Sequence, residues 1–533
     1  MRTLSAVAIA VTITAGLVPV RGASNKGEQA AKVRPPAVAG AFYPSDPAEL
    51  ARVIDGFLAK ATPPPVDNLI ALIAPHAGYP YSGPVAAYSY ALLKGRKYDR
   101  VVIIAPSHYE AFDYSSVYDG AAYSTPFGQV PVDQAFAARL ARISPSIKLS
   151  GAGHTPTPER PEHALEVQLP FLQRVLGQFQ LVPVIMGDQS YDACRALGVA
   201  LAKLVQGTNT LIIASSDLSH YHTYDEAEKI DHKTLKAIQE FDYFDLSRNL
   251  ELRVWEACGG GPIVAAMIAA ERLGANQAKL LRYANTGDVT GDHSRVVGYS
   301  AFALVKAAGT AKTDEVPFSL TNKEKDALLK IARKSVETAV RDGKTYECST
   351  GGMDALAQER GAFVTLTKNG DLRGCIGSVA PVKPLYLTVR EVAVLAALRD
   401  TRFRPVVTSE LPDLHYEISV LSPLRRVMDI HEIQIGLHGL LIREHGYEGL
   451  FLPQVATEEK WDRATLLREV CHKAGLPGSA WQEPDTDLFR FTALVFGEVN
   501  PVSALAQPRR RETLRAEPGQ PAPGSPVPTA APF

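Results

Sequence analysis

The sequence has almost no net charge and few cysteines, and both shortages limit what the protein can do. Lys and Arg number 56 against 57 Asp and Glu, so the net charge at pH 7 is -1. Proteins that bind nucleic acid need a basic surface for its phosphates, so we expect no nucleic-acid partner. The five cysteines among 533 residues are an odd number and widely scattered. At least one cysteine is therefore free or bound to something else.

Long apolar runs are missing after the first two dozen residues. No later stretch approaches the ~18 apolar residues of a membrane-spanning helix, so we expect no membrane span in the mature chain. Residues 1–23 combine one Arg, an apolar run and the small residues Gly22 and Ala23. This pattern is typical of a secretory signal peptide, with an uncleaved membrane anchor as the alternative. We therefore predict export to the periplasm or the extracellular space.

The length of the chain predicts more than one domain, because a single core rarely serves 533 residues. Residues 307–319 are polar and lack periodicity, which is typical of a linker. They divide residues 33–306 from residues 320–500. Residues 501–533 are rich in Pro and Ala, so we expect this tail to be disordered.

The first domain has the pattern of an α/β sandwich. Unbroken apolar runs at residues 68–74, 99–106, 179–186 and 209–215 are typical of strands covered on both faces. Segments such as "YDACRALGVALAKLV" between the runs have helical spacing. In a sheet covered by helices on both sides, ligands bind outside the carboxyl ends of the strands, where the loops meet.

Polar side chains follow three of these four apolar runs. His76 follows the first run, His108 the second, and Asp217 and His220 the last. One His after a strand is usually a loop residue, but three such coincidences in one domain favour a common site. Imidazole and carboxylate groups are the ligands of iron, zinc or copper.

Two further segments add candidates to this site. Cys258 stands before glycines and a proline that mark a helix start, where a positive helix end favours a thiolate. A thiolate binds soft metals and attacks carbonyl carbons, whereas a buried small hydrophobe is the alternative role. In "RPEHALEVQLPFLQ", His163 and Glu166 are three residues apart, which predicts one helical face with His163 in the cleft. The alternative is that Glu162 and Glu166 are exposed to solvent.

Six ordered motifs resemble the Memo family over residues 33–306: "RPPAVAGAFYPSDPAEL", "APHAGYPYSG", "PSHY", "EHALEVQLPFL", "SSDLSHY" and "ACGGGPI". That family is similar in fold to the class III extradiol dioxygenases, which hold non-haem iron. The resemblance implies a metal site of His76, His108 and Cys258, lined by Asp217, His163 and His220. Since the dioxygenases use two His and one carboxylate, a Cys in the third position favours copper or thiol-ligated iron and puts ring cleavage in doubt.

The second domain has an α+β pattern. Residues 322–340 have the spacing of an amphipathic helix, and residues 362–379 that of a hairpin with an Asn369-Gly370 turn of type I′. Residues 489–499 predict one closing strand of a largely antiparallel sheet.

The stretch "LRGCIGSV" holds Cys375, a candidate catalytic residue. Gly374 and Gly377 are expected to clear space around its sulfur. Three arginines, Arg373, Arg402 and Arg404, are expected to lower the pKa of the thiol or to bind an anion. The alternative is a packed Cys with exposed arginines. Through "LRGCIGS", "RFRPV" and "GYEGLFLPQVA" this domain resembles the AMMECR family, which implies no particular activity.

Together the halves resemble a fusion of proteins B and A of the AmmeMemoRadiSam system, which implies a radical SAM protein as a partner. Our leading hypothesis is an oxidoreductase-like protein with iron or copper held by the His/His/Cys set, and Asp217 or His220 moving protons. A hydrolase with Cys258 as nucleophile, His220 as base and Asp217 as orienter is one alternative. A module that binds a peptide or small anion without turnover is another.

Overall fold

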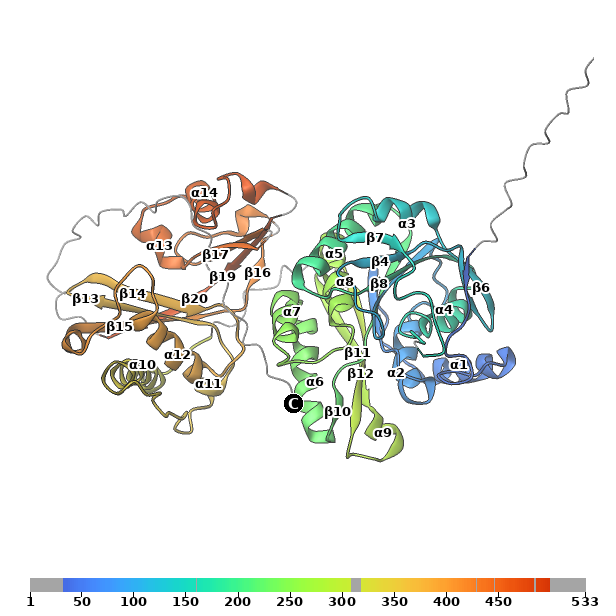
Figure 1. Cartoon of the computed structure of the whole chain (residues 1–533), viewed down its shortest axis with the longest axis horizontal. Helices are drawn as coiled ribbons and strands as arrows, with labels where there is room; N and C mark the ends of the chain where they lie inside the picture. Colours follow the sequence, from blue (N-terminus) through green and yellow to red (C-terminus); the bar gives the residue numbers. More distant parts are fainter. Residues whose placement is uncertain are drawn as a thin grey trace, which may run out of the picture. The chain divides into compact units, whose positions relative to one another are not determined.

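The computed structural model describes residues 32–159, 161–307, 318–427, 429–444, 446–483 and 486–498. The chain forms two compact units, which divide between residues 311 and 312 (Figure 1). The predicted signal peptide, the predicted tail and residues 308–317 of the predicted linker lie outside the described residues. Within the described ranges, no helix is long and apolar enough to cross a membrane.

The N-terminal unit is built on a nine-stranded mixed sheet, as the α/β prediction requires. Its strands follow the order β10-β12-β2-β9-β3-β8-β4-β7, and β11 pairs with β12. The strands are β2 (Leu69–Ala74), β3 (Arg100–Pro106), β4 (Ser115–Tyr118), β7 (Ile147–Ser150), β8 (Gln180–Met186), β9 (Thr210–Ser215), β10 (His220–His222), β11 (Gln277–Asn285) and β12 (Val296–Val305). The four predicted strands β2, β9, β3 and β8 are adjacent and parallel.

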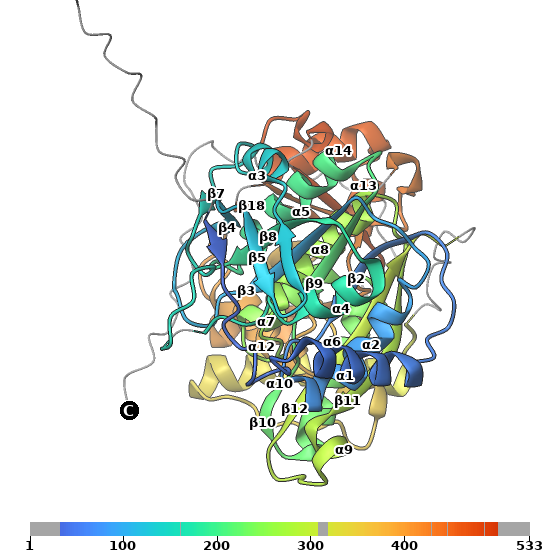
Figure 2. The same cartoon turned by 90° about the vertical axis from the view of Figure 1, so that its right-hand side faces the viewer.

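Helices cover both faces of this sheet. On one side α8 (Gly260–Arg272) packs on β9, β3 and β2, with α5 (Tyr191–Val205) and α7 (Tyr243–Glu251) beside it, while α6 (Tyr224–Gln239) packs on α7, β11 and β12. On the other side lie α1 (Pro47–Lys60), α2 (Tyr79–Ala91) and α4 (Gln168–Leu176), which stand in front of the sheet in Figure 2. The unit is completed by α3 (Gln134–Leu140), α9 (Thr286–Thr290) and a small sheet of β1 (Val33–Arg34), β5 (Ala122–Thr125) and β6 (Gly128–Pro131).

The strand register brings the loops that follow the central strands together. Ala74 at the end of β2 pairs with Ser215 at the end of β9, and Ile104 of β3 pairs with Ala214 of β9. Because these strands are parallel, their carboxyl ends lie at the same edge of the sheet. The candidate side chains that follow them are therefore delivered to one place.

The C-terminal unit contains two four-stranded antiparallel sheets, with the orders β14-β13-β15-β20 and β16-β19-β17-β18. The strands are β13 (Ala362–Lys368), β14 (Asp371–Ser378), β15 (Leu414–Leu421), β16 (Arg425–Arg426), β17 (Gly439–Glu444), β18 (Tyr447–Phe451), β19 (Asp487–Phe491) and β20 (Ala493–Gly497). The helices are α10 (Asn322–Asp342), α11 (Asp354–Ala357), α12 (Leu385–Leu398), α13 (Pro453–Glu458) and α14 (Arg463–Lys473). The α+β prediction is thus confirmed.

One predicted strand of this unit is wrong in an informative way. The apolar run at residues 489–499 was expected to form a single strand, but it divides at Thr492 into β19 and β20, which belong to different sheets. The Thr492 N–H donates to Ser422 Oγ at 2.9 Å and its carbonyl accepts from Ser422 N–H at 2.9 Å. These two bonds hold the crossing point, which an apolar pattern alone does not reveal.

The glycines beside Cys375 serve packing, which corrects the expectation that they clear space for its sulfur. A Cβ at Gly374 would collide with the carbonyl oxygen of Ala396 in α12, and a Cβ at Gly377 would enter the ring of Phe363.

The predicted hairpin turn is present, since Asn369 and Gly370 have φ angles of 53° and 91°.

A buried polar cluster in the N-terminal unit surrounds His154. Its Nε2 lies 2.9 Å from the carbonyl oxygen of Ser116 and its Nδ1 lies 2.5 Å from the Tyr123 hydroxyl. The Arg34 guanidinium covers the Tyr123 ring at 4.8 Å and donates to the His154 carbonyl oxygen at 2.8 Å. Burial lowers the pKa of His154 to about 3. The imidazole is therefore neutral when the unit is folded.

This depressed pKa predicts a pH dependence of stability. The unfolded chain takes up a proton at His154 near pH 6.5 and the folded chain only near pH 3, so the stability from this residue is lost as the pH falls through that window. We measure the slope of the free energy of unfolding against pH between pH 6 and 4. We expect this slope to be steeper in the native protein than in His154→Gln, by about 1 kcal/mol per pH unit. Urea unfolding at each pH measures both slopes, and equal slopes would contradict the assignment.

Candidate metal centre

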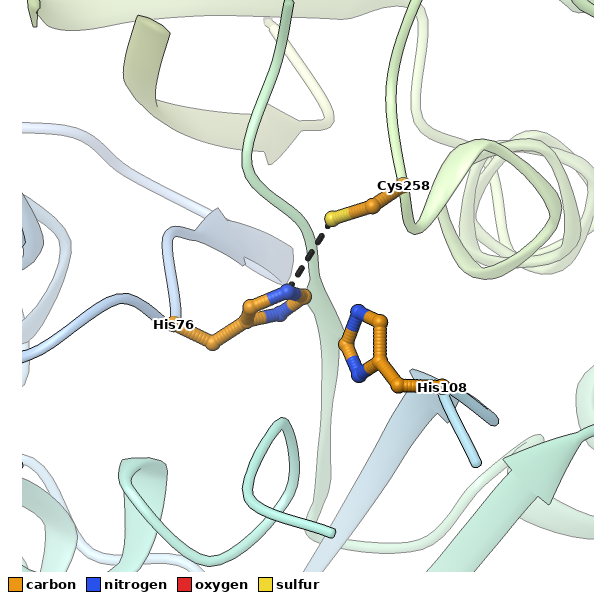
Figure 3. Close-up of side chains that lie close together, drawn as sticks. All are labelled: His76, His108 and Cys258. Atoms are coloured by element: carbon orange, nitrogen blue, oxygen red, sulfur yellow. Dashed lines mark hydrogen bonds between the residues drawn. The ribbon is translucent and has the colours of Figure 1, made fainter. Parts of the chain in front are cut away.

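Three candidate side chains meet at the carboxyl edge of the large sheet (Figure 3). The ligand atoms of His76, His108 and Cys258 all lie within 4.8 Å of one another. The closest pair is Cys258 Sγ and His76 Nε2, at 3.0 Å. The two imidazole rings stand edge to face, with centroids 5.2 Å apart. His76 is buried, whereas the side chain of His108 is 27% exposed, so the cluster is open to solvent on the His108 side.

The orientation of His76 is fixed from behind by Ser215. The Ser215 hydroxyl donates its only proton to the carbonyl oxygen of Ala164 at 2.6 Å. Its oxygen also receives an N–H from Gln168 at 2.7 Å and lies 2.9 Å from His76 Nδ1. Since the hydroxyl proton is already used, Nδ1 of His76 must be the donor. The lone pair of Nε2 then faces Cys258.

Gln168 in turn is held by two partners that fix its amide. Its Nε2 donates to the Pro75 carbonyl oxygen at 3.0 Å, and its Oε1 accepts from the Tyr90 hydroxyl at 2.5 Å. Gln168 and Tyr90 are buried, and Pro75 directly precedes the buried His76. The direction of the His76 ring therefore depends on a chain of hydrogen bonds that leads back to α2.

Glu162 orients His108 in the same way. One carboxylate oxygen lies 3.0 Å from His108 Nδ1 and the other accepts from the His108 main-chain N–H at 2.6 Å. The first oxygen also accepts the N–H groups of His163 and Ala164, at 2.9 and 3.1 Å. Burial alone would raise the pKa of Glu162, but the hydrogen bonds from these donors lower it to about 2. Burial alone would lower the pKa of His108, but the Glu162 carboxylate raises it. Nε2 of His108 is left pointing toward the cluster.

The solvated alternative for Glu162 and Glu166 is wrong, because their exposed fractions are 4% and 0%. Glu166 accepts from Arg34 at 2.6 Å, from the Tyr43 hydroxyl at 2.6 Å, and from the N–H groups of Ala37 and Val38 at 2.7 and 3.0 Å. Arg34 also donates to the Glu162 carbonyl oxygen at 2.5 Å. Arg34 and Glu166 therefore connect the start of the unit to the turn that contains Glu162, whose carboxylate orients His108.

His163 enters the same cleft, but it does so from a turn, because α4 begins only at Gln168. Its ring stacks on His108 with centroids 4.9 Å apart and lies 5.6 Å from His76. Burial and the neighbouring imidazoles lower its pKa to about 4, so its ring is neutral near pH 7. Its Nδ1 is buried without a hydrogen-bond partner among the described residues.

Cys258 reaches the cleft because a glycine follows it. A Cβ at Gly259 would collide with the carbonyl oxygen of Ser215, so only glycine allows the start of α8 to approach the end of β9. Gln189 fixes this start, since its amide donates to the Cys258 carbonyl oxygen at 3.1 Å and accepts from Gly261 N–H at 2.8 Å. Burial and the charge of Asp217 raise the pKa of the Cys258 thiol. The expectation that the helix start favours a free thiolate is thus wrong.

Asp217 and His220 also line the cleft, and their ligand atoms lie within 4.8 Å of Cys258 Sγ. Asp217 accepts the main-chain N–H of His76 at 2.7 Å, and burial raises the pKa of its carboxyl. His220 Nδ1 lies 2.8 Å from the Leu218 carbonyl oxygen, which makes it the donor. Asp217 therefore does not orient His220 as the predicted hydrolase triad requires.

Cys375, the candidate of the C-terminal unit, lies half-buried on the edge strand β14. Of the three arginines predicted to serve it, Arg373 pairs with Glu410 at 2.8 Å and Arg404 is exposed. Only Arg402 bonds to Cys375, by donating to its carbonyl oxygen at 3.1 Å. Burial raises the pKa of the Cys375 thiol despite Arg402, which corrects the predicted lowering.

Sequence reasoning missed Ser215, Gln168 and Arg34 as parts of the site, and it did not pair Glu166 with Arg34. All four stand inside or beside the quoted motifs, and a small hydroxyl at the end of an apolar strand was the available signal for Ser215. Their function depends on strand register and on a turn, neither of which a single sequence specifies.

Comparisons with known proteins match each half of the chain to a different family. The family model described as "Memo-like protein" matches residues 34–303, and the model described as "AMMECR1" matches residues 329–496. A MEMO1 family protein of Methanopyrus kandleri is 38% identical over 284 residues, which are 51% of this chain and 98% of that protein. One from Methanocaldococcus jannaschii is 40% identical over 287 residues, with 51% and 98% coverage. A solved structure, uncharacterized protein PH0010 from Pyrococcus horikoshii, is 35% identical at a TM-score of 0.33 and covers 34% of this chain and 95% of its own.

The Ser215 contact predicts which nitrogen of His76 carries the proton. In metal-free protein at pH 7 we expect the Nδ1–H tautomer, and in Ser215→Ala a shift toward Nε2–H, because the acceptor behind Nδ1 is gone. Long-range ¹H–¹⁵N spectra of protein with labelled histidine report the tautomer. Ser89→Ala is the matched control, since it removes another buried hydroxyl that bonds to a carbonyl without contacting His76. An unchanged tautomer in Ser215→Ala would refute the assignment.

Proposed function

The chain belongs to the Memo family through residues 34–303 and carries an AMMECR1 domain at residues 329–496, and we propose that its N-terminal unit binds one iron or copper ion. The ligands are His76, His108 and Cys258. The observation that carries this proposal is the convergence of their ligand atoms within 4.8 Å at the carboxyl edge of the sheet.

The donor set fits a transition-metal ion. Both imidazoles use Nδ1 to bond away from the cluster, so that each offers Nε2 in the manner of metal-binding histidines with outer hydrogen-bond partners. A metal ion ~2.0 Å from each nitrogen and ~2.3 Å from sulfur accommodates the 3.0 Å separation of Cys258 Sγ and His76 Nε2. The mixed nitrogen and sulfur set favours copper or thiol-ligated iron over calcium or magnesium, which prefer oxygen ligands.

We further propose an oxidoreductase-like activity at this site. A bound iron or copper ion supplies redox chemistry and Lewis acidity. Asp217 and His220 lie next to Cys258 and are placed to hold or move a proton on the substrate. His163 stays neutral near pH 7 and, with the Phe42 ring tilted against it at a centroid distance of 4.5 Å, forms an uncharged wall of the cleft. Substrate reaches the cluster from the exposed side of His108.

The nucleophilic hydrolase is the weaker candidate. Cys258 pairs with His76 at 3.0 Å, whereas the predicted base His220 bonds through Nδ1 to the Leu218 carbonyl oxygen, and the raised pKa of the Cys258 thiol opposes a free thiolate. A binding module for a peptide or a small anion, without turnover, is the outcome if the metal-loaded protein proves inert toward oxygen and reductants.

Export and a radical SAM protein as partner also remain proposals of ours. They rest on residues 1–23 and on the pairing of the two family domains in one chain. The N-terminal residue of protein recovered from a native-like host tests the first proposal: a chain that still begins at Met1 in the cytoplasm argues against it.

Elemental analysis tests the metal proposal directly. We expect purified protein reconstituted with iron or copper to retain about one ion per chain, and His76→Ala or Cys258→Ser to lose at least tenfold in affinity, because a ligand is removed. His232→Ala is the matched control, since His232 lies on α6, where it contacts the Glu228 carbonyl oxygen and the Tyr283 ring and belongs to none of the candidate metal groups found among the described residues. Stoichiometric metal in both ligand variants would contradict the assignment of this site.

A further inference from the structure

The segment that leads into His220 is bulged against β12. Leu218 N–H donates to the carbonyl oxygen of Gly298 at 2.8 Å, and Gly298 N–H donates to the carbonyl oxygen of Ser219 at 3.0 Å. Two residues of the segment therefore oppose one residue of β12, which is the arrangement of a β-bulge. The peptide group between these two residues is not paired with the strand. Among the described residues, neither the Ser219 N–H nor the Leu218 carbonyl oxygen bonds to another main-chain group.

Two side chains bind this peptide group instead, one at each end. The Ser219 N–H donates to Oδ1 of Asp231 at 2.9 Å. At the other end, the Leu218 carbonyl oxygen accepts from Nδ1 of His220 at 2.8 Å. A trans peptide group is planar and rigid, and its N–H and C=O point in opposite directions. The bond to Asp231 therefore fixes the direction from which the carbonyl oxygen meets the imidazole.

Asp231 comes from α6, which lies beside β11 and β12 (Figure 1). Its exposed fraction is 0%. A Cβ at Gly298 would collide with Oδ2 of Asp231, so glycine is needed there for the carboxyl to lie against β12. Oδ2 accepts from the Tyr283 hydroxyl of β11 at 2.9 Å. Among the described residues, no cationic side chain pairs with Asp231. Because a buried carboxyl without a counter-ion is costly, the hydrogen bonds from Ser219 and Tyr283 are what hold it in the core.

His220 also lies next to the candidate metal centre. One of its ring nitrogens is within 4.8 Å of Cys258 Sγ. Since Nδ1 donates to Leu218, the nitrogen that is free to accept a proton is Nε2. Asp217 does not orient this ring, because its carboxylate accepts the main-chain N–H of His76. The orientation of the His220 ring therefore comes from the peptide group behind it.

We propose that Asp231 is a positioning residue for His220, which acts through the peptide group between Leu218 and Ser219 and keeps Nε2 of the ring free for proton transfer. The inference rests on the proposed function, in which His220 holds or moves a proton on the substrate. The series of carboxyl, peptide and imidazole replaces the direct carboxyl–imidazole pair of a catalytic triad. Hydrogen bonds in series polarise one another, so the bond to Asp231 also makes the carbonyl oxygen a stronger acceptor.

The tautomer of His220 in the metal-free full chain tests this assignment. Long-range ¹H–¹⁵N spectra at pH 8 give the ratio of the two tautomers, and His220→Gln identifies the signals. Tyr283→Phe is compared with the double variant Asp231→Leu with Tyr283→Phe, in which apolar groups of similar shape replace both polar partners and so preserve the packing. We expect Nδ1–H in the native chain and in Tyr283→Phe. In the double variant we expect the ratio of Nδ1–H to Nε2–H to fall about fivefold, the factor that one lost hydrogen bond produces.

Asp231→Asn should restore the native tautomer, because its amide oxygen accepts from Ser219 as the carboxyl does. The His76 tautomer is an internal control, since Ser215 holds that ring and the substitutions at Asp231 leave this contact in place. Circular dichroism shows whether each variant is folded, and Asp231→Ala, with the same expected shift, replaces a double variant that does not fold.

A native ratio that persists in the folded double variant, or in folded Asp231→Ala, would overturn the proposal. These spectra need no metal, so their outcome is separate from that of the metal analysis. A chain that retains no metal but shows the expected tautomers would refute the proposed function and leave the role of Asp231 in orienting His220 intact.

Discussion

Hydrogen bonds on the outer side of two imidazole rings, those of His76 and His108, fix how the candidate metal centre is arranged. The Ser215 hydroxyl already donates its proton to the Ala164 carbonyl oxygen, so it can only accept the N–H of His76. Glu162 is ionised because its pKa is lowered to about 2, so it can only accept the N–H of His108. His76 and His108 therefore present Nε2 to the same point as the sulfur of Cys258. Without these two acceptors, no hydrogen bond at Nδ1 would hold the rings in the orientations that point both Nε2 atoms toward the cluster. The sheet register, the Gly259 contact and the buried Arg34–Glu166 pair all serve to keep them in place.

Much of this arrangement could be predicted from the sequence, because its signals are local. The apolar runs predicted β2, β3, β8 and β9, and parallel strands deliver the residues that follow them to one edge. The rest depended on relations that a single sequence does not specify. Glu162 is buried only because a turn carries it under His108, and Asp217 bonds to a main-chain N–H instead of orienting His220. The division of the last apolar run at Thr492 and the packing of Gly374 on α12 likewise depend on tertiary contacts.

The two units use cysteine in different surroundings. Cys258 lies among imidazoles and a carboxyl, a set suited to a metal ion, which would bind the thiol in its deprotonated form although burial and Asp217 raise the pKa of that thiol. Cys375 lies on the edge strand β14, where Arg402 donates to its carbonyl oxygen and burial raises the pKa of its thiol.

X-ray absorption at the iron or copper edge of the reconstituted protein tests the central claim most directly. The account predicts one sulfur neighbour at ~2.3 Å and at least two imidazole nitrogens at ~2.0 Å, with the sulfur shell absent from Cys258→Ser. A metal surrounded only by oxygen and nitrogen in the native protein, or a sulfur shell that survives in Cys258→Ser, would show that the ion lies elsewhere and would remove the basis for the proposed chemistry.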